Sequence, residues 1–287
     1  MRILIFLIRW KGGVGVVINS IKKELIKKGH TVTTISREED LKYFSSVKSI
    51  FELRKRYKKI IEKENPDIIY TQDWSMALPL LFPLPLFEKK HYCCFHGNQF
   101  GKTVLLQTLI GKWFGKNLFV VGNSLKKRFP KSTLVHNGVD LKKFKPLKKK
   151  RNCLGWINKS TEMFTKEEIL ILAKKLKLKP LIAENFKIPF DKMNEDFYNK
   201  CKVFVSLPPH SAGFNLCWVE AMAAGVPIIA GNNEGIGCKL PIDKFKSKEH
   251  FLKNLKNLTK KNYRKEIIKI GLTWENHVKR LLEIWKK

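Results

Sequence analysis

The chain has 287 residues, 44% of them hydrophobic, with 17 glycines and 12 prolines. This composition excludes a disordered or fibrous protein, and the length accommodates two domains of ordinary size. The formal net charge of +32 attracts polyanions such as nucleic acid, anionic lipid headgroups or phosphorylated substrates. An ordinary solvated surface explains the charge equally well, because many of the lysines fall on the polar faces of predicted helices.

The first half of the chain alternates strands with helices. Ile3–Ile8 predicts a buried strand and not a signal peptide, because Arg9 and a Lys-Gly-Gly turn follow it in place of a cleavage site. A helix is expected near Val14–Lys28, ended by Gly29, and a second amphipathic helix stops before Pro66. Further strands are expected at Thr31–Ile35, Asp67–Tyr70, His91–Phe95, Leu118–Val121 and Thr133–Val135.

One helix of this half, Thr103–Gly115, combines apolar side chains with lysines at its ends. We expect Leu105 and Leu109 to pack into the core of the first domain. Trp113 is the candidate for a peripheral contact with an anionic membrane surface. The lysines that would share this contact are Lys102, Lys112 and Lys116. No uninterrupted apolar stretch reaches the length of about 18 residues that a membrane-spanning helix needs.

The basic segment Leu141–Arg151 interrupts the alternation, which restarts beyond it. Strands are expected at Cys153–Trp156, Pro180–Ala183, Val203–Leu207 and Pro227–Ala230, and helices near Lys166–Leu176, Asp191–Lys200 and Asn215–Ala224. Continuous apolar strands between helices indicate parallel sheets that are covered on both faces. We therefore predict two Rossmann-like, doubly wound α/β domains, residues 1–145 and 146–273, with the last helix, 274–287, packing back on the first. Ligands of such domains bind beyond the carboxyl ends of the strands.

The cysteines give no sign of a metal site. None of them forms a C-x-x-C pair, and several lie in apolar runs, where cysteine acts as a small hydrophobic residue. Their positions are Cys93, Cys94, Cys153, Cys201, Cys217 and Cys238. We expect reduced thiols, no structural metal and a cytoplasmic protein.

Two features follow the predicted strands of the first domain. The glycine turn at Gly12–Gly15 opens a helix, and backbone N–H groups at such a place favour an anion, although a plain tight turn explains the glycines as well. His96 closes the strand that ends at Phe95 and is followed by Gly97. It lies where a ligand would be held, or it is a structural histidine bonded to a loop carbonyl.

Longer motifs carry a family resemblance. Val135–Pro146 resembles the N-G-V-D-x-x-x-F-x-P hinge entry of the family-4 retaining glycosyltransferases, and Ala212–Pro227 is similar to their E-G-F-G-x-x-x-x-E-A-M-A-x-G-x-P-V signature. Weaker landmarks occur in the same order as in the family, at residues 12–15, 25–32, 66–72, 121–124 and 273–275. The resemblance covers essentially the whole chain and implies the GT-B fold.

The resemblance also implies a reaction. A sugar would pass from a UDP or GDP donor to a hydroxyl of a glycan or lipid-linked acceptor, with retention and without a metal ion or cofactor. The catalytic candidates are His96 on the donor sugar, Lys159 on the phosphates and Glu220, whose carboxylate can accept two ribose hydroxyl bonds. The donor-binding candidates are Gly13, Gly15, Asn137, Gly213, Phe214, Asn215, Leu216 and Glu220. A surface helix glutamate is the alternative for Glu220.

The chain also departs from the family pattern. Ala212 replaces the first glutamate of the E-x7-E pair, Asn215 replaces a glycine, and Lys159 stands closer to its strand than usual. A strand-helix unit is missing between Ala183 and Asp191, which predicts a trimmed donor domain. A non-catalytic GT-B protein that binds a sugar nucleotide or glycan is therefore the alternative function. A nucleic-acid-directed glycosyltransferase is a third alternative, ranked below the others because no zinc-finger spacing or RNA-binding sheet motif occurs.

Overall fold

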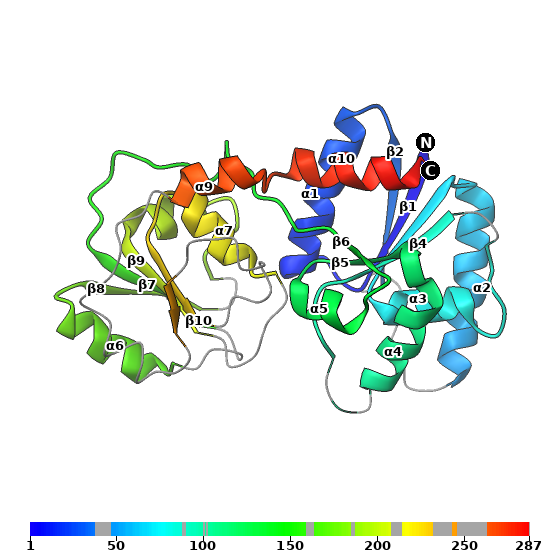
Figure 1. Ribbon diagram of the computed structural model, residues 1–287, viewed down its shortest axis with the longest axis horizontal. Helices are drawn as coiled ribbons and strands as arrows, with labels where there is room; N and C mark the ends of the chain where they lie inside the picture. The colour runs from blue at the N-terminus through cyan, green and yellow to red at the C-terminus, as the bar shows by residue number, and fades with distance from the viewer. Residues whose placement is uncertain are drawn as a thin grey trace. The chain divides into compact units, whose positions relative to one another are not determined.

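The computed structural model describes residues 1–37, 47–87, 90–99, 101, 103–158, 164–184, 187–207, 214–231, 243–245 and 263–286. The chain divides into two compact units (Figure 1), and each is described by itself. Unit 1 comprises Met1–Asn137 and Trp274–Lys287, and unit 2 comprises Gly138–Thr273. Residues 138–145, which the sequence assigned to the first domain, thus belong to unit 2.

The core of unit 1 is a six-stranded sheet in which all paired strands are parallel. Its strands are β1 (Arg2–Leu7), β2 (Thr31–Ser36), β3 (Ile68–Gln72), β4 (Lys90–Phe95), β5 (Leu118–Val120) and β6 (Thr133–Leu134). They follow the order β2-β1-β3-β4-β5-β6, so the chain reverses its direction of winding between β1 and β3. This confirms the predicted doubly wound parallel sheet, and it places the topological switch point between those two strands.

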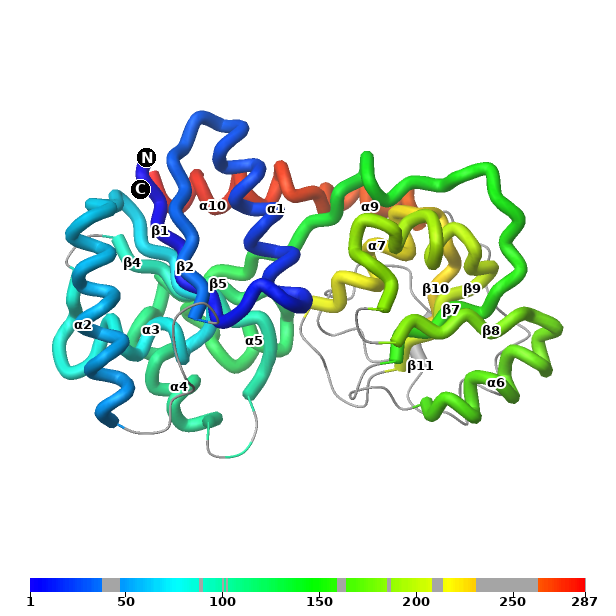
Figure 2. The backbone as a smooth tube through the Cα atoms, turned by 180° about the vertical axis from the view of Figure 1, so that it is seen from behind, coloured from blue at the N-terminus to red at the C-terminus, as the bar shows by residue number. Residues whose placement is uncertain are grey.

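Two groups of helices cover the two faces of this sheet. The helices of unit 1 are α1 (Gly13–Lys27), α2 (Val47–Glu64), α3 (Trp74–Leu81), α4 (Thr103–Phe114), α5 (Asn123–Arg128) and α10 (Trp274–Trp285). In both views α10 lies beside α1, whereas α2, α3 and α4 lie together (Figures 1 and 2). The apolar residues of β1 and β3 that do not face α1 pack with α2 and α3, for example Leu4 with Tyr57 and Met76. Burial on both faces is the reason why the strands are almost continuously apolar.

Helix α10 belongs to unit 1 although the whole of unit 2 precedes it in the chain. The Trp285 ring lies 5.4 Å from Tyr70 and 6.2 Å from Tyr92, measured between ring centroids. Lys90 Nζ donates a hydrogen bond of 2.9 Å to the Trp285 carbonyl, and His277 Nδ1 lies 2.8 Å from the His136 carbonyl. The two ends of the chain therefore complete the same core.

Helix α4 presents a different face to the core than the sequence predicted. Leu105 and Leu109, expected in the core, are 65% and 55% exposed. Gln107 is fully buried in their place, because its side chain bonds the Gly97 carbonyl and the Gln99 N–H at 2.9 and 3.2 Å. The apolar residues that α4 does bury are Ile110 and Phe114.

Unit 2 is built around a five-stranded parallel sheet in the order β11-β10-β9-β7-β8. Its strands are β7 (Cys153–Ile157), β8 (Lys179–Ala183), β9 (Cys201–Ser206), β10 (Ile228–Gly231) and β11 (Asp243–Phe245). Its α-helices within the described residues are α6 (Lys166–Lys175), α7 (Leu216–Ala223) and α9 (Tyr263–Ile270). The sequence did not predict β11 or α9, which lie between the signature motif at 212–227 and the last landmark at 273–275.

The segment between β8 and β9 contains less regular secondary structure than the sequence predicted. The predicted helix Asp191–Lys200 is instead a π-helical turn, Met193–Phe197, followed by a 3-10 turn, Tyr198–Lys200. Asn199 is fully buried there and donates from Nδ2 to the carbonyls of Lys145 and Asn194 at 3.0 and 2.9 Å. The described residues 187–200 contain these two turns and no strand.

Candidate functional site

A cavity of about 460 Å³ opens at the carboxyl ends of three strands of unit 1. The loop after β1 contributes Ile8, Arg9 and residues 11–14, the end of β3 contributes Gln72 and Asp73, and the end of β4 contributes His96, Gly97 and Gln99. The cavity thus lies at the switch point of the sheet, where open α/β folds bind ligands. Its volume is within the range of small-molecule sites, about 300–1,000 Å³.

The glycine turn forms one wall of this cavity. Gly12 has a φ of 96°, a conformation that a side chain rarely adopts, and it precedes α1 without a side-chain cap. Gly13 lines the cavity, as the sequence predicted for a ligand-binding residue. Gly15 is buried instead, and a Cβ atom there would lie 1.7 Å from the Trp10 carbonyl oxygen. Close packing therefore explains the glycine at position 15 without any ligand.

His96 lines the same cavity and is held by a side chain. Its Nε2 lies 2.7 Å from Gln72 Oε1, so its observed partner is not a loop carbonyl. Burial lowers the pKa of His96 to about 4, with a smaller contribution from His277, and the imidazole is neutral at pH 7. Gln72 is buried, and its Nε2 has no hydrogen-bond partner among the described residues. A ligand in the cavity would meet a neutral imidazole.

Asp73 is a residue of the cavity that sequence reasoning missed. Its φ of 80° is strained for a residue with a side chain, and such strain concentrates at functional sites. Its Oδ1 accepts a hydrogen bond from the Trp74 N–H at 2.6 Å, and its Oδ2 accepts one from Gln99 Nε2 at 3.2 Å. Burial raises the pKa of Asp73 to about 6. An acidic residue directly after a buried parallel strand was the available signal.

A buried polar network supports the wall that carries His96. Gln107 of α4 holds the loop at Gly97 and Gln99, and Arg128 of α5 donates to Gln107 Oε1 at 2.8 Å. Arg128 also donates to the Thr108 hydroxyl at 2.6 Å. Because each of these groups is bonded to the next, the loop is fixed by two helices.

In unit 2, the signature motif begins helix α7. Phe214 is buried, and Asn215 is the N-cap without a side-chain bond to the first turn, which starts at Leu216. Glu220 is only 7% exposed, and its Oε2 accepts a hydrogen bond of 2.8 Å from the Tyr198 hydroxyl. Burial raises the pKa of Tyr198, and the negative charge of Glu220 raises it further, so the phenol remains a donor. A surface glutamate is therefore excluded at position 220.

The remaining predicted residues are placed as follows. Asn137, the last residue of the first segment of unit 1, is 2% exposed, and its Oδ1 has no partner among the described residues. Lys159 and Gly213 lie outside the described residues, as does Ala212. The structure thus brings Gly13 and His96 together in the unit 1 cavity, and it groups Phe214, Asn215, Leu216 and Glu220 on α7.

Two arginines bind carbonyl groups at the carboxyl end of α7. Arg264 donates from Nη1 to the carbonyls of Phe144 and Ala223, and from Nη2 to the Leu141 carbonyl at 2.9 Å. Arg151 donates to the carbonyls of Ala224 and Gly225, each at 2.7 Å. Cations are favourable at the carboxyl end of a helix, where carbonyl groups lack partners within the helix.

We expect Arg264→Ala to destabilise unit 2 by about 2 kcal/mol, because carbonyl groups would lose a charged donor. The free energy of unfolding in urea measures this. Lys269→Ala removes an exposed cation from the same helix and is the matched control. Equal stability of the two variants would contradict the role assigned to Arg264.

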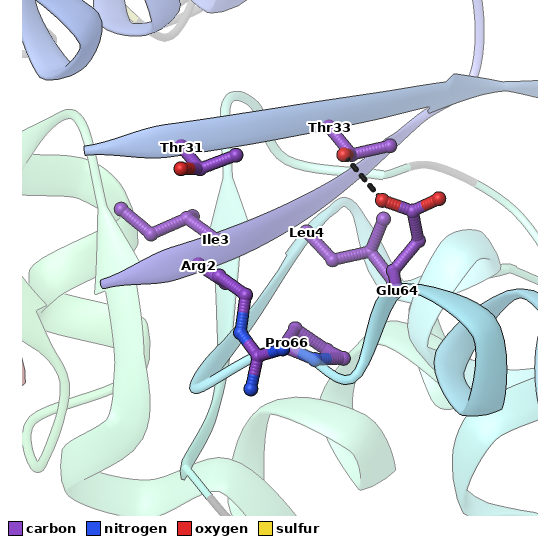
Figure 3. A pocket seen from close by; sticks show the side chains of 7 residues that line it. All are labelled: Arg2, Ile3, Leu4, Thr31, Thr33, Glu64 and Pro66. Atoms are coloured by element: carbon purple, nitrogen blue, oxygen red, sulfur yellow. Dashed lines mark hydrogen bonds between the residues drawn. The ribbon is translucent and has the colours of Figure 1, made fainter.

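A second, much smaller cavity lies at the opposite, amino ends of β1 and β2 (Figure 3). Its volume is about 30 Å³, enough for water-sized molecules only. Glu64 points toward Thr33 there, and Thr33 Oγ1 donates to Glu64 Oε2 at 2.7 Å. Its carboxylate is already bonded within the fold, so this cavity is not a candidate substrate site.

Comparison with known proteins assigns the chain to a family. Glycosyltransferase Family 4 matches residues 11–143, and Glycosyl transferases group 1 matches residues 165–245. Among curated proteins, no sequence matches the chain. Within the residues that the structure describes, no helix is both long and apolar enough to span a membrane.

Solved structures of glycosyltransferases share the fold. A glycosyltransferase from Rickettsia africae is 18% identical with a TM-score of 0.70, over 99% of this chain and 97% of that one. Sucrose-phosphate synthase from Thermosynechococcus elongatus is 13% identical with a TM-score of 0.73, over 100% and 98%. HepE from Anabaena, solved in complex with UDP, is 11% identical with a TM-score of 0.70, over 100% of both chains. With two parallel-sheet α/β domains and family matches in both, the chain belongs to the family 4, group 1 glycosyltransferases of the GT-B fold.

Proposed function

We propose that this glycosyltransferase transfers a sugar from a nucleoside diphosphate to a hydroxyl group of a glycan or lipid-linked acceptor, with retention at the anomeric carbon. The cavity of unit 1 carries the proposal. A small-molecule-sized cavity lies at the switch point of a family-matched domain, and a glycine turn and a neutral histidine line it. The arrangement suits a polar, uncharged group such as a sugar ring beside a phosphate.

The proposed donor is a UDP or GDP sugar. Structures of the Anabaena protein HepE have been solved with UDP and with UDP-glucose, and they share the fold of this chain. In the proposal, the N–H groups at Gly13 lie near the diphosphate, and His96 bonds a hydroxyl of the donor sugar. Because Nε2 donates to Gln72 Oε1, the neutral imidazole has Nδ1 left to accept a bond from such a hydroxyl. Its Gln72 partner holds the ring in place.

Residues of unit 2 take the nucleotide in this proposal. Lys159 and the N–H groups of residues 213–215 bind the phosphates, and the carboxylate of Glu220 accepts bonds from the ribose hydroxyls. Burial of Glu220 supports this role, because a carboxylate in a desolvated position bonds hydroxyl groups strongly. Tyr198 orients it. Phe214 and Leu216 complete the proposed donor residues of unit 2, and Asn137 is a proposed donor residue of unit 1.

The chemical step needs stabilisation of the leaving diphosphate. The acceptor hydroxyl attacks the anomeric carbon from the face that the diphosphate leaves, and the departing phosphate oxygen takes its proton. Fixed N–H groups and the Lys159 ammonium stabilise the developing charge, so the proposal includes no metal ion or cofactor. The protein works in the cytoplasm, and a peripheral contact with the inner face of the membrane would bring it to lipid-linked acceptors.

A thermal-shift comparison tests the donor. We expect UDP or GDP, or one of their sugars, to raise the Tm of the native chain, because a ligand that binds only the folded state stabilises it. Glu220→Ala should lose most of this shift. Glu195→Ala, which removes an exposed carboxylate of the same unit, is the matched control and should retain most of the shift.

Two outcomes would decide against parts of the proposal. Absence of any shift with every nucleotide would contradict the donor site. A shift without release of UDP or GDP from the donor sugar, with or without acceptors, would favour a non-catalytic sugar-nucleotide-binding protein. Ala212, in place of the first glutamate of the family signature, is the observation behind that second candidate.

A further inference from the structure

Helix α4 has an apolar stripe on its solvent side. Leu105, Leu109 and Trp113, which we call the α4 stripe, are 65%, 55% and 64% exposed. They are spaced four residues apart, so their side chains follow one another along one face of the helix. The core-facing side is occupied separately by Gln107, Ile110 and Phe114. No requirement of the unit 1 core therefore accounts for the stripe.

The segment that contains the stripe carries charge of one sign. Between Glu88 and Asp140 the chain contains no acidic residue, and residues 90–139 contain eight lysines and arginines. Lys112, next to Trp113, and Lys116, just after the helix, are both exposed. An apolar stripe with basic residues at one end suits a partner that has an apolar interior beneath an anionic surface layer.

Helix α6 shows that exposed apolar residues alone do not indicate a docking surface. It exposes Leu170 and Ile171, but these are neighbours in sequence and do not form a stripe. Its first turn carries Glu167 and Glu168, so acidic and basic side chains are mixed along it. Scattered exposed apolar residues of this kind are normal on a protein surface.

We propose that the α4 stripe docks on the surface of a lipid bilayer that contains anionic lipids. Leu105 and Leu109 would enter the boundary between headgroups and acyl chains, and Trp113 would lie at the headgroup level. Lys112 and Lys116 would face the lipid phosphates. Docking by α4 rests on the peripheral membrane contact of the proposed function and names the surface that makes it. Because it does not use the cavity of unit 1 or helix α7, sugar transfer and docking can each fail without the other.

A second copy of the chain fits the stripe less well. A two-fold interface places the same patch of both copies together. An α4 helix of the other copy, which contains no acidic residue, would offer Lys112 and Lys116 no anionic partner. An anionic bilayer supplies the opposite charge instead.

Vesicle flotation with the full chain tests the proposal. We expect the native protein to float with vesicles of mixed phosphatidylcholine and phosphatidylglycerol, and far less with phosphatidylcholine alone. A variant with Leu105→Ser, Leu109→Ser and Trp113→Ser should bind the mixed vesicles at least about tenfold more weakly. The matched control, Leu170→Ser with Ile171→Ser, should bind like the native chain.

Each contrary result has a defined meaning. Equal binding of the stripe variant and the native chain would show adsorption by net charge alone and overturn the proposal, and so would the absence of binding to either vesicle. A native dimer in sedimentation equilibrium that the stripe variant abolishes would assign the stripe to a second copy. A Tm shift with nucleotide that is the same in the stripe variant and the native chain would verify its fold and keep this test separate from that of the donor site.

Discussion

Gly15→Ala should unfold or rearrange the first turn of α1 and destabilise unit 1 by at least about 3 kcal/mol. The added Cβ atom would lie 1.7 Å from the Trp10 carbonyl oxygen and 2.5 Å from its carbonyl carbon. Both are backbone atoms, so no side-chain rotation relieves the overlap. The turn at Gly12 and Gly13, which forms the cavity wall, would have to move. The variant should therefore also lose its thermal response to nucleotides.

Gly97→Ala is the matched control for this variant. Gly97 lines the same cavity, but a Cβ atom there would meet nothing within 4 Å, and its φ is not positive. We expect its midpoint of urea unfolding, followed by circular dichroism, to stay close to that of the native chain. Similar midpoints for the alanine variants at 15 and 97 would contradict the packing described at the start of α1.

Asp73→Asn should make the protein more stable at neutral and alkaline pH. Burial raises the pKa of Asp73 from 3.8 to about 6 in the folded chain. The stability that Asp73 contributes is fully present below its unfolded pKa, where both states are protonated, and is lost as the pH rises through about 6. The difference in pKa corresponds to about 3 kcal/mol at about pH 8, and to about half of that at about pH 5.

Asparagine keeps the shape of the side chain, tolerates a positive φ and does not ionise. The gain in the free energy of unfolding of Asp73→Asn should therefore be larger at about pH 8 than at about pH 5. Asp67→Asn, which alters an exposed carboxyl group of the same unit, serves as the control and should show no comparable gain. A gain at Asp73 that does not depend on pH would contradict the buried, ionised carboxylate.

The same variant connects stability with function. The Asp73 carboxylate lowers the stability of the fold, and it lies on a strained backbone beside the cavity. Such a residue is expected where it contributes to ligand binding or catalysis. We expect Asp73→Asn to transfer the sugar more slowly while melting at a higher temperature. A variant that is more stable and equally active would leave Asp73 without a role in the reaction.

Much of the fold could be predicted because its signals are local. Apolar runs such as Ile3–Ile8 and His91–Phe95 are nearly continuous only when both faces of a strand are buried, and this requires a parallel sheet covered by helices. Gly29 and Pro66 end their helices in any context. The signature around Glu220 likewise predicted a buried helix with a carboxylate, since the apolar residues beside it would not be exposed together.

Other features depend on residues far apart in the chain. Helix α4 has apolar side chains on both faces, so its periodicity could not show that Gln107 would be buried and Leu105 exposed. Gln107 faces the core because it bonds the Gly97 carbonyl and accepts a bond from Arg128. Residues 193–200, predicted as part of a helix at 191–200, form π and 3-10 turns, in which Asn199 bonds the carbonyls of Lys145 and Asn194.

The sequence by itself determined the two α/β domains, the family and the helix that carries Glu220, because periodicity and short motifs encode these features locally. Only the tertiary structure showed that Gly15 is required by the Trp10 carbonyl, that Tyr198 bonds Glu220, and that Asp73 is buried on a strained backbone. The burial of a side chain, its close contacts and its pKa depend on residues that only folding brings together, so a local sequence pattern cannot predict them.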